Sequence, residues 1–352
     1  MNISVKITLL PFFLLLAVGC NQSYNFFNGK YLYSPYNGIV DHLNGEVVDI
    51  DILGFKILWI EDSVLLVSTR QDPQKLVSAY SLHDYHPLYE GLILKGRGPN
   101  EFLNVSFVSS FTDSVGIKIW LSVDYGQKLL CIDLTCSIKN QNLVIIKEID
   151  LSQLEDLFAL FRISVQCDTS IILERIYSNV HITNYNPVSK KETSIGWLYS
   201  EEIDRSNVTD IASTGFFFDA EKSFLISGML FFNQINFFDL RYPEQSFSTS
   251  TAKKSTHYYL INQVEVGVRP QYYYGPIDGH NMLIFGYLNG KNQYGYESTE
   301  NNFLHIVDWN GKTRHVFLLD RPFTGDAFDK RTGYLYGTDN ETQDILKYKL
   351  QL

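Results

Sequence analysis

Cysteine is scarce in this chain, and the few cysteines match neither a disulfide framework nor a metal site. Four occur among 352 residues, and only Cys131, Cys136 and Cys167 lie beyond the first twenty. Three cysteines in an exported chain cannot all pair with one another, and their spacing fits no metal-binding motif. Cys131 and Cys167 lie within apolar runs, so we expect buried free thiols rather than a disulfide.

Motifs for common catalytic and nucleotide-binding sites are also missing. The chain has no Gly-x-Ser-x-Gly elbow, no recognisable Ser/His/Asp arrangement, and neither a P-loop nor a Rossmann fingerprint. Charged residues make up only 19% of the chain, the net charge is −10 and the pI is near 5.3. An acidic chain without a basic run argues against a nucleic-acid partner.

The first twenty residues, MNISVKITLLPFFLLLAVGC, are typical of an export signal. One Lys precedes an apolar stretch too short to span a membrane comfortably. The stretch from Ala17 to Cys20 resembles a bacterial lipoprotein cleavage box, with Ala17 where Leu is usual. We therefore expect a signal peptide over 1–19, lipid on Cys20 that anchors the chain to a membrane, and a linker over 20–42. An ordinary secretory signal with a chance Cys is the alternative.

One sequence pattern recurs six times: an apolar stretch, an Asp, a second apolar stretch, a short gap and a third stretch with an aromatic or aliphatic anchor. The Asp residues are 51, 55, 51, 59 and 51 residues apart. A period near fifty that is built from strand-like segments is typical of a β-propeller. The six residues are Asp62, Asp113, Asp168, Asp219, Asp278 and Asp329.

The spacing inside each unit is almost constant. From the Asp to the late anchor it is 17 to 19 residues in five units and 29 in the fifth, which therefore carries an insertion within GYLNGKNQYGYESTENN. The segments are rich in Val, Ile, Phe, Tyr and Leu and are separated by Gly, Asn, Asp and Pro, as strands and turns are. The anchors are Tyr80, Ile132, Tyr185, Phe238, Val307 and Tyr348.

A fourth strand follows the anchor in five units, as PLYEGLILK, NLVIIKEID, ETSIGWLY, SFSTST and TRHVFLL. The sixth unit ends at Leu352 before such a strand, and EVVDIDI (46–52) precedes the first unit. We expect EVVDIDI to complete the sixth blade, because an open ring exposes two sheet edges. The prediction is an all-β, six-bladed β-propeller with four antiparallel strands per blade, one domain over 43–352. A solenoid is disfavoured because six units fill the mature chain.

The repeated Asp residues are interpreted as structural. Each falls at the turn between the first and second strands, where its carboxylate can accept a backbone N–H two residues on. The Ser-x-Asp-x-Gly-x-Thr-Trp box of sialidases and the Trp-Asp signature of WD repeats are both absent. A catalytic or metal-binding ring of Asp residues is the less favoured reading.

The most distinctive loop is KGRGPNEF, which follows the fourth strand of the first unit. Gly96 and Gly98 permit positive φ, Pro99 stiffens the turn, and Arg97 and Glu101 carry opposite charges. A phosphate cradle does not fit, because a strand rather than a helix is predicted to follow.

The same loop carries a family resemblance. A Gly-x-Gly-Pro-x-Glu-Phe loop between the first two blades, behind a lipoprotein signal, resembles the six-bladed, TolB-like propeller lipoproteins of Bacteroides-type bacteria. Asn100 stands where that family often has Gly. The resemblance covers nearly the whole mature chain. It implies the propeller fold and an outer-membrane lipoprotein of the cell envelope, facing either the periplasm or the surface.

Strand alternation places the inter-blade loops and the loops between second and third strands on one face, and the Asp turns on the other. Propeller ligands commonly bind where inter-blade loops meet the central channel. Four arginines fall just before an innermost strand or at its start, where they would hold a carboxylate or sulfate. These are Arg97, Arg162, Arg269 and Arg321. Salt bridges to Glu101, Asp210 or Asp320 are the alternative.

Tyrosines on the same face suggest an aromatic platform for a sugar or peptide. Tyr272, Tyr273 and Tyr274 are consecutive, and Tyr294 and Tyr296 lie in the fifth-unit insertion. Alternation along a strand should bury at least one of the three consecutive rings.

The sequence therefore favours a membrane-anchored, non-catalytic module without a cofactor, which binds a peptide, glycan or envelope protein on the inter-blade loop face. The site residues of this hypothesis are the four arginines with Glu101, Tyr272 and Tyr273. The alternative is a Ca²⁺-dependent hydrolase or lactonase with the metal in the channel, for which Glu101, Asn104 and Asp210 are candidate ligands. A structural subunit of a larger envelope complex is a third possibility.

Overall fold

The computed structural model describes residues 27–50, 55–69, 72–199, 214–253, 270–279, 281–290 and 302–352. Several expectations lie outside these residues. They concern the signal peptide (1–19), Cys20, Asp210, Arg269, and the tyrosines of the fifth-unit insertion, Tyr294 and Tyr296. Among the helices that the structure describes, none is long and apolar enough to cross a membrane.

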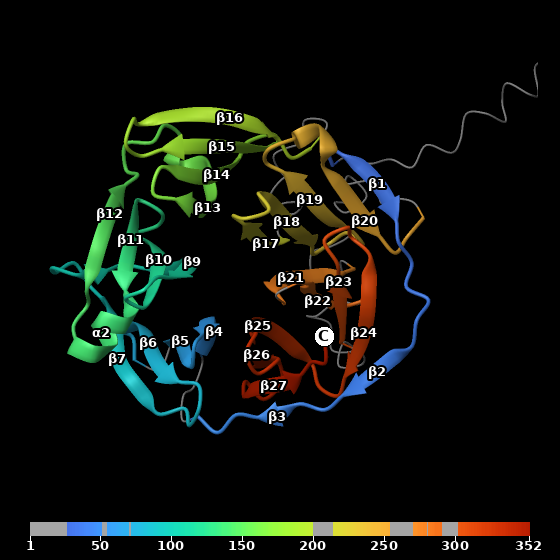
Figure 1. Ribbon diagram of the computed structural model, residues 1–352, viewed down its shortest axis with the longest axis horizontal. Helices are drawn as coiled ribbons and strands as arrows, with labels where there is room; N and C mark the ends of the chain where they lie inside the picture. The colour runs from blue at the N-terminus through green and yellow to red at the C-terminus, as the bar shows by residue number, and fades with distance from the viewer. Residues whose placement is uncertain are drawn as a thin grey trace, which may run out of the picture.

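Six sheets stand in a ring, and each has four antiparallel strands counted outward from the centre (Figure 1). The innermost strands are β4 (Phe55–Glu61), β9 (Val105–Thr112), β13 (Leu160–Cys167), β17 (Thr214–Asp219), β21 (Tyr273–Asp278) and β25 (Phe323–Asp329). The second strands are β5 (Val64–Thr69), β10 (Ile117–Val123), β14 (Ser170–Ile176), β18 (Phe224–Met229), β22 (Leu283–Tyr287) and β26 (Tyr334–Asp339).

The late anchors all lie in the third strands or at their ends, as predicted. These strands are β6 (Lys75–Ser81), β11 (Lys128–Asp133), β15 (Val180–Asn186), β19 (Ile235–Asp239), β23 (Phe303–Val307) and β27 (Ile345–Lys349). The outermost strands are β7 (Pro87–Lys95), β12 (Ile145–Asp150), β16 (Lys191–Trp197), β20 (Phe247–Ser250), β24 (Thr313–Leu319) and β3 (Glu46–Val47). The all-β six-bladed propeller is therefore confirmed.

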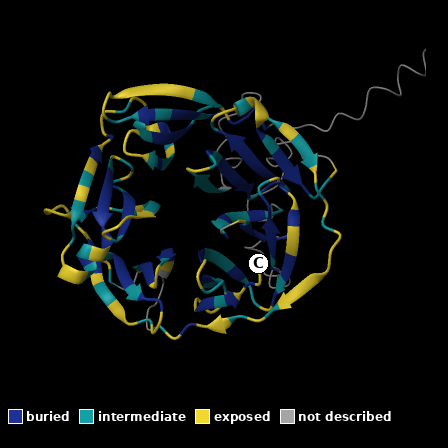
Figure 2. Ribbon diagram, in the orientation of Figure 1, coloured by how far each residue is buried: buried dark blue, intermediate teal, exposed yellow. Residues whose placement is uncertain are grey.

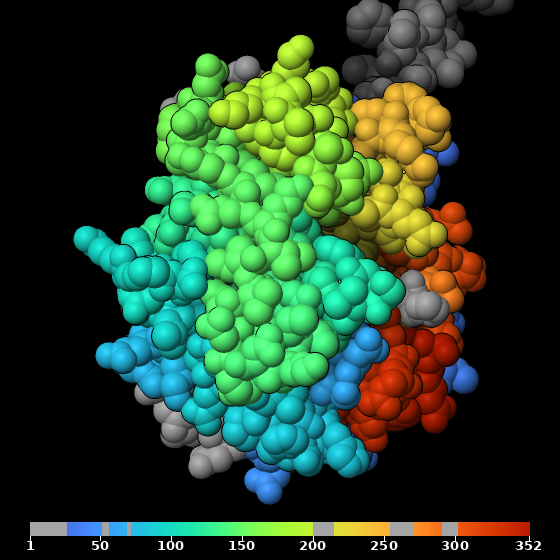
Figure 3. Space-filling model, turned by 60° about the vertical axis from the view of Figure 1, so that its left-hand side comes forward, coloured from blue at the N-terminus to red at the C-terminus, as the bar shows by residue number. Residues whose placement is uncertain are grey.

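The core lies between neighbouring blades. Every residue of β19 and of β22 is buried, because each middle strand packs on a blade at both faces. The outermost strand β16, by contrast, has no buried residue. Figure 2 shows this gradient from buried middle strands to exposed outer edges. Figure 3 shows the outer sides of the second and third blades packed side by side, in teal and green.

The ring closes at the sixth blade by the predicted N-terminal strand. β3 pairs antiparallel with β27, and the Val48 N–H donates to the Ile345 carbonyl at 2.8 Å. Asp320 fastens this junction, since its Oδ1 accepts the Gly45 N–H at 3.0 Å and the Tyr348 hydroxyl at 2.8 Å. The closing strand has only two residues, fewer than the seven expected.

Two further strands before β3 were not predicted. β1 (Lys30–Tyr33) pairs in parallel with β20, and β2 (Val40–Leu43) pairs in parallel with β24. Residues 27–50 therefore form a strap that runs along the outside of the fourth, fifth and sixth blades (Figure 1). Phe27, at its start, is buried in the core between the third and fourth blades.

Four short elements complete the fold. The helix α2 (Leu134–Asn140) was not predicted; Asp133 caps it by accepting the Cys136 N–H at 2.8 Å. Short 3-10 helices are η1 (Leu157–Ala159) and η2 (Pro243–Gln245), and β8 (Glu101–Phe102) pairs in parallel with the end of β7.

The three described cysteines are free, as expected. Cys131 is buried between the second and third blades, and Cys136 is half-buried in α2. Cys167 is exposed, which corrects the expectation that it is buried. The reason is its place at the end of β13, beside the Asp168 turn, where the apolar run has already left the core.

Candidate functional site

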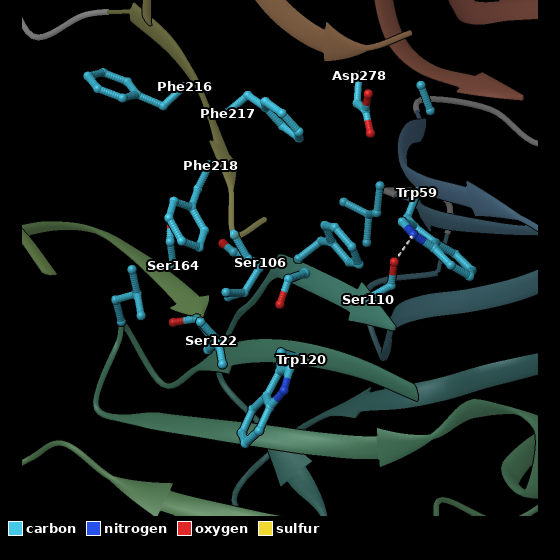
Figure 4. A pocket seen from close by; sticks show the side chains of 18 of the residues that line it. Trp59, Ser106, Ser110, Trp120, Ser122, Ser164, Phe216, Phe217, Phe218 and Asp278 are labelled. Carbon is cyan, nitrogen blue, oxygen red and sulfur yellow. Dashed lines mark hydrogen bonds between the residues drawn. The ribbon is translucent and has the colours of Figure 1, made fainter. Parts of the chain in front are cut away.

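The central channel is a hollow with a cavity volume of about 1770 Å³. All six innermost strands contribute to its wall, and Figure 4 shows lining side chains from β4, β9, β13, β17 and β21. Ligand pockets for small molecules typically measure roughly 300–1,000 Å³. The channel therefore has room for a ligand larger than a single small molecule.

Bulges in the innermost strands shape this wall. The register shifts in β4, β9, β13, β21 and β25, whereas β17 pairs with β18 without a shift. A bulge adds a residue to one strand and re-aims the side chain there. Leu58, Val108, Phe161 and Asp326 occupy such positions, and all four line the channel.

One sector of the channel combines aromatic rings with hydroxyl groups. Phe216, Phe217 and Phe218 project from β17, and Ser106, Ser122 and Ser164 lie opposite on the second and third blades (Figure 4). Ser106 and Ser122 are cross-strand partners. Among the described residues, none of the three hydroxyls has a hydrogen-bond partner. We call these six residues the aromatic–hydroxyl wall.

A buried ion pair lies behind this wall. Arg162 and Glu174 are cross-strand partners on β13 and β14, with Nη1 and Oε1 3.6 Å apart. That separation is too long for a hydrogen bond, and burial raises the pKa of Glu174 to about 7 in spite of the guanidinium. Arg162 also lies over the rings of Phe161 and Phe216, at 4.3 and 3.9 Å from their centroids. Arg162 is thereby fixed against the channel wall.

A second perturbed carboxyl group lies on the sixth blade. Burial raises the pKa of Asp326 to about 7, although Lys56 of the adjacent first blade and the Thr338 hydroxyl both act to lower it. The Thr338 Oγ1 is 3.5 Å from Asp326 Oδ2. Asp326 and Lys56 both line the channel, so this acid is largely protonated below neutral pH and ionised above it.

Hydrogen bonds also join the first and second blades along the channel. The Trp59 indole N–H donates to Ser110 Oγ at 2.9 Å, and the Ser110 hydroxyl donates to Glu61 Oε2 at 2.9 Å. Figure 4 shows the Trp59–Ser110 bond. Because their polar groups are paired, these residues position the blades rather than offer free donors.

The predicted turn function of the repeated Asp residues holds for part of the set. Asp113 Oδ1 accepts the N–H of Val115 at 2.8 Å, and Asp329 Oδ1 accepts that of Arg331 at 3.0 Å, each two residues on. Asp219 instead accepts the Lys222 N–H, three residues on, at 2.6 Å.

Two other repeated Asp residues form ion pairs between blades. Asp168 pairs with Lys147 of the second blade at 2.8 Å, and Asp278 pairs with Lys330 of the sixth. All of the repeated Asp residues except Asp113 line the channel at its turn end.

A more regular polar turn follows the late anchor and was missed in the sequence. Asp239 Oδ1 accepts the N–H groups of Arg241 at 2.8 Å and Tyr242 at 2.9 Å, and Asp308 and Asn186 make equivalent bonds. Asp133 does the same at the start of α2. The signal was readable, because each of these residues comes directly after the anchor of its unit.

The KGRGPNEF loop is held by its own carboxylate. Glu101 Oε2 accepts the Gly98 N–H at 2.9 Å, and a Cβ on Gly96 would collide with the same carboxylate. Neither glycine has positive φ; Asn100 does, at 61°, which corrects the expectation for this loop. The glycines are needed for close approach rather than for a left-handed turn.

The four predicted arginines do not converge among the described residues. Arg97 is exposed at the tip of its loop, and Arg321 pairs with Asp339 at 3.6 Å rather than with Asp320. Arg162 alone of the described members lines the channel. Arg269 lies outside the described residues.

The predicted tyrosine platform is largely interior. Tyr273 is 2% exposed and packs against Phe285, Tyr287 and His305. Burial raises the pKa of Tyr272, which is half-buried. Tyr273 therefore belongs to the core between the fourth and fifth blades.

The candidate Ca²⁺ ligands are occupied locally. Glu101 holds the KGRGPNEF loop, and Asn104 Oδ1 accepts the Tyr125 N–H at 2.6 Å. Asp210 lies outside the described residues. Within the described part of the chain, no three His, Cys, Asp or Glu side chains are grouped so that they could hold a metal ion.

Comparison with known proteins supports the architecture. No known family profile matches the chain, and no curated protein matches its sequence. In fold it is similar to a member of the DUF4221 family from Bacteroides vulgatus, with TM-score 0.57 and 12% identity over 89% of this chain and 97% of that one. At that identity the likeness shows the propeller fold alone.

Two other solved structures are less similar. A Bacteroides fragilis protein has TM-score 0.49 and 13% identity, over 91% of this chain and 98% of that chain. The Cps50 (Swd1) β-propeller domain of Myceliophteria thermophila has TM-score 0.41 and 11% identity, over 87% and 100%.

Proposed function

We propose that this chain is a non-catalytic binding protein of the bacterial cell envelope, and that its ligand, a glycan, is held in the central channel. The observation that carries the proposal is the aromatic–hydroxyl wall. Aromatic rings stack on the C–H faces of sugars, while hydroxyl groups exchange hydrogen bonds with sugar hydroxyls. Phe218 and Ser164 present these two kinds of group from adjacent blades (Figure 4).

The location in the envelope rests on the N-terminal sequence. The apolar stretch before Cys20 and the box from Ala17 to Cys20 support export and lipid attachment. A membrane anchor at Cys20 would leave only a few residues before Phe27, which is buried in the ring. The propeller would then lie close to the membrane, with the blade that carries β1 nearest to it.

The size of the channel supports an oligosaccharide rather than a single sugar. Its volume of about 1770 Å³ exceeds the usual range for small-molecule pockets. The wall also offers hydroxyl groups from both the second and the third blade, through Ser106, Ser122 and Ser164. A ligand that spans these blades would use all three.

Titration calorimetry tests the proposal. Soluble oligosaccharides of glucose, xylose, mannose and N-acetylglucosamine are titrated into the full-length chain. The double variant Ser122→Ala, Ser164→Ala should weaken binding about tenfold, since each lost hydrogen bond is worth about 0.5–1.5 kcal/mol. Ser189→Ala, on an exposed turn away from the channel, is the matched control. The proposal fails if no oligosaccharide binds, or if the control weakens binding equally.

A further inference from the structure

Exposed aromatic side chains gather at the inter-blade end of the channel. Tyr125 is 71% exposed in the turn between β10 and β11, and Phe158 is 90% exposed in η1 between β12 and β13. Leu103 and Phe161 are exposed beside them, and Phe161 and Tyr125 also line the channel mouth. Large apolar side chains gathered in this way mark interaction surfaces.

The loops that carry these side chains are braced against one another. Asp124 Oδ1 accepts the Leu103 N–H at 2.9 Å, and Asn104 Oδ1 accepts the Tyr125 N–H at 2.6 Å. The Gln127 carbonyl accepts the Leu151 N–H at 2.8 Å, at the start of the connection that leads to Phe158. The backbone of these loops is therefore held in place before any partner arrives, which lowers the entropy lost on binding.

The backbone beneath Tyr125 is strained. Asp124, Tyr125 and Gly126 are consecutive left-handed residues, with φ of 51°, 59° and 84°. Only Gly adopts this conformation without cost, and for a bulky side chain it is an outlier. Such residues cluster where a binding surface needs a particular side chain. Tyr125 keeps this conformation while its ring is 71% exposed, so the side chain is open to a partner.

Carboxylates lie on the same loops as these rings. Asp124, Asp156 and the exposed Glu155 belong to the bracing loops. The Asp156 carboxylate accepts the neutral Tyr177 hydroxyl at 3.1 Å. Two nearby cations are already engaged, since Lys128 is paired with Glu148 at 2.8 Å and Arg162 lies over the Phe161 ring. Aromatic faces among carboxylates attract lysine and arginine, through ion pairs and cation–π contacts.

We propose that this rim, made of Leu103, Tyr125, Phe158 and Phe161 with the carboxylates of Asp124, Glu155 and Asp156, docks a segment of a partner protein. The segment presents lysine or arginine next to apolar side chains. The inference is independent of the glycan in the channel, because it rests on other residues and can fail alone.

Fluorescence anisotropy with the full-length chain tests this docking. One labelled peptide contains lysine, leucine and glycine, and a matched peptide has glutamate in place of lysine. The affinity for the lysine peptide should be at least about tenfold higher than for the glutamate peptide, because its charge complements the carboxylates of the rim. Its affinity should fall as salt rises.

Variants test whether the lysine peptide binds at the rim. Tyr125→Ala with Phe158→Ala should weaken the lysine peptide by about tenfold or more, as loss of two aromatic anchors does. Tyr242→Ala, which removes a 52% exposed ring between β19 and β20, should leave its affinity unchanged. Equal binding of both peptides, no binding of the lysine peptide, or an equal loss in Tyr242→Ala would overturn the proposal. Oligosaccharide binding in these variants shows whether the channel is intact.

Discussion

At one end of the channel the chain repeats itself, and at the other it does not. The turn end carries the repeated Asp residues and the Asx turns after the anchors, such as those of Asp239 and Asp308. At the inter-blade end the connections differ in length and conformation, from the KGRGPNEF loop to the strained turn at Tyr125. Asp side chains at the turn end bond to the backbone or pair with lysines of other blades, whereas the inter-blade end leaves aromatic rings exposed.

The difference between the two ends of the channel indicates which features of a repeat protein serve its function. A residue that recurs in most blades answers a need that every blade has, such as closing a turn. A residue that occurs in one blade, at a cost in backbone strain, answers a need of the whole molecule. Tyr125 is of the second kind. Phe158 and the wall of the channel also occur in one part of the ring, but without positive φ.

The largest effect should come from breaking the ring on which both ends depend. Deleting residues 27–50 removes β1, β2 and β3 and exposes the edge of β27. The free energy of unfolding, roughly 5–15 kcal/mol for a typical domain, should fall by a large part of its value. The reason is that sheet edges and the Phe27 site open to water. Urea unfolding followed by circular dichroism measures it. A truncated chain that unfolds at the same urea concentration as the full chain would show that closure is unimportant.

A smaller effect is expected from one repeated turn. Asp239→Ala removes the acceptor of the Arg241 and Tyr242 N–H groups and should lower the free energy of unfolding by about 1–3 kcal/mol. Oligosaccharide affinity should not change. Asp41→Ala, on the exposed strand β2, is the control and should have little effect. If Asp239→Ala left stability intact but reduced binding, the turn end would be functional and the comparison would be reversed.

Stability should also depend on pH through the two buried acids. The pKa values of Asp326 and Glu174 are raised to about 7, above those of the unfolded chain, so the folded state holds more protons between about pH 4 and 7. The stability that these two protonated acids give the folded state is therefore fully present below pH 4. It is lost as pH rises toward 7. Asp326→Asn and Glu174→Gln should each flatten the fall in melting temperature between pH 5 and 8. Unchanged slopes in both variants would contradict these pKa directions.

The smallest effect should be at the strained turn. Tyr125→Gly relieves the left-handed conformation and should raise the free energy of unfolding by about 1 kcal/mol. The same variant should bind the lysine peptide more weakly. Chemical denaturation and anisotropy on one sample measure both. If Tyr125→Gly destabilised the chain, the Tyr125 side chain would be part of the core. The inter-blade end would then serve stability, as the turn end does.

Local periodicity was sufficient to predict the blades. The Asp spacing, the anchors from Tyr80 to Tyr348, the outer strands and the closure by β3 could all be read from the sequence, because each is a short strand with its own turn signals. The strap could not. β1 and β2 are short, and their parallel pairing with β20 and β24 brings together residues more than two hundred positions apart.

The site was harder to predict than the fold. Arg97 and Arg321 both precede an innermost strand, yet each meets different neighbours. Arg162 reaches the channel because it lies within β13, beside a bulge that no local pattern announces. The aromatic–hydroxyl wall could be recognised in part from the sequence. The innermost-strand segments SFVSS and FRISVQ contain polar residues, whereas other strands are apolar.

Hydrogen exchange with the tightest-binding oligosaccharide tests the central claim most directly. The account predicts slower exchange in β9, β10, β13 and β17, which carry the aromatic–hydroxyl wall, and no change in the Asx turns at Asp239 and Asp308. Protection confined to those turns or to the outer strands, or no protection at any concentration, would contradict a glycan site in the channel.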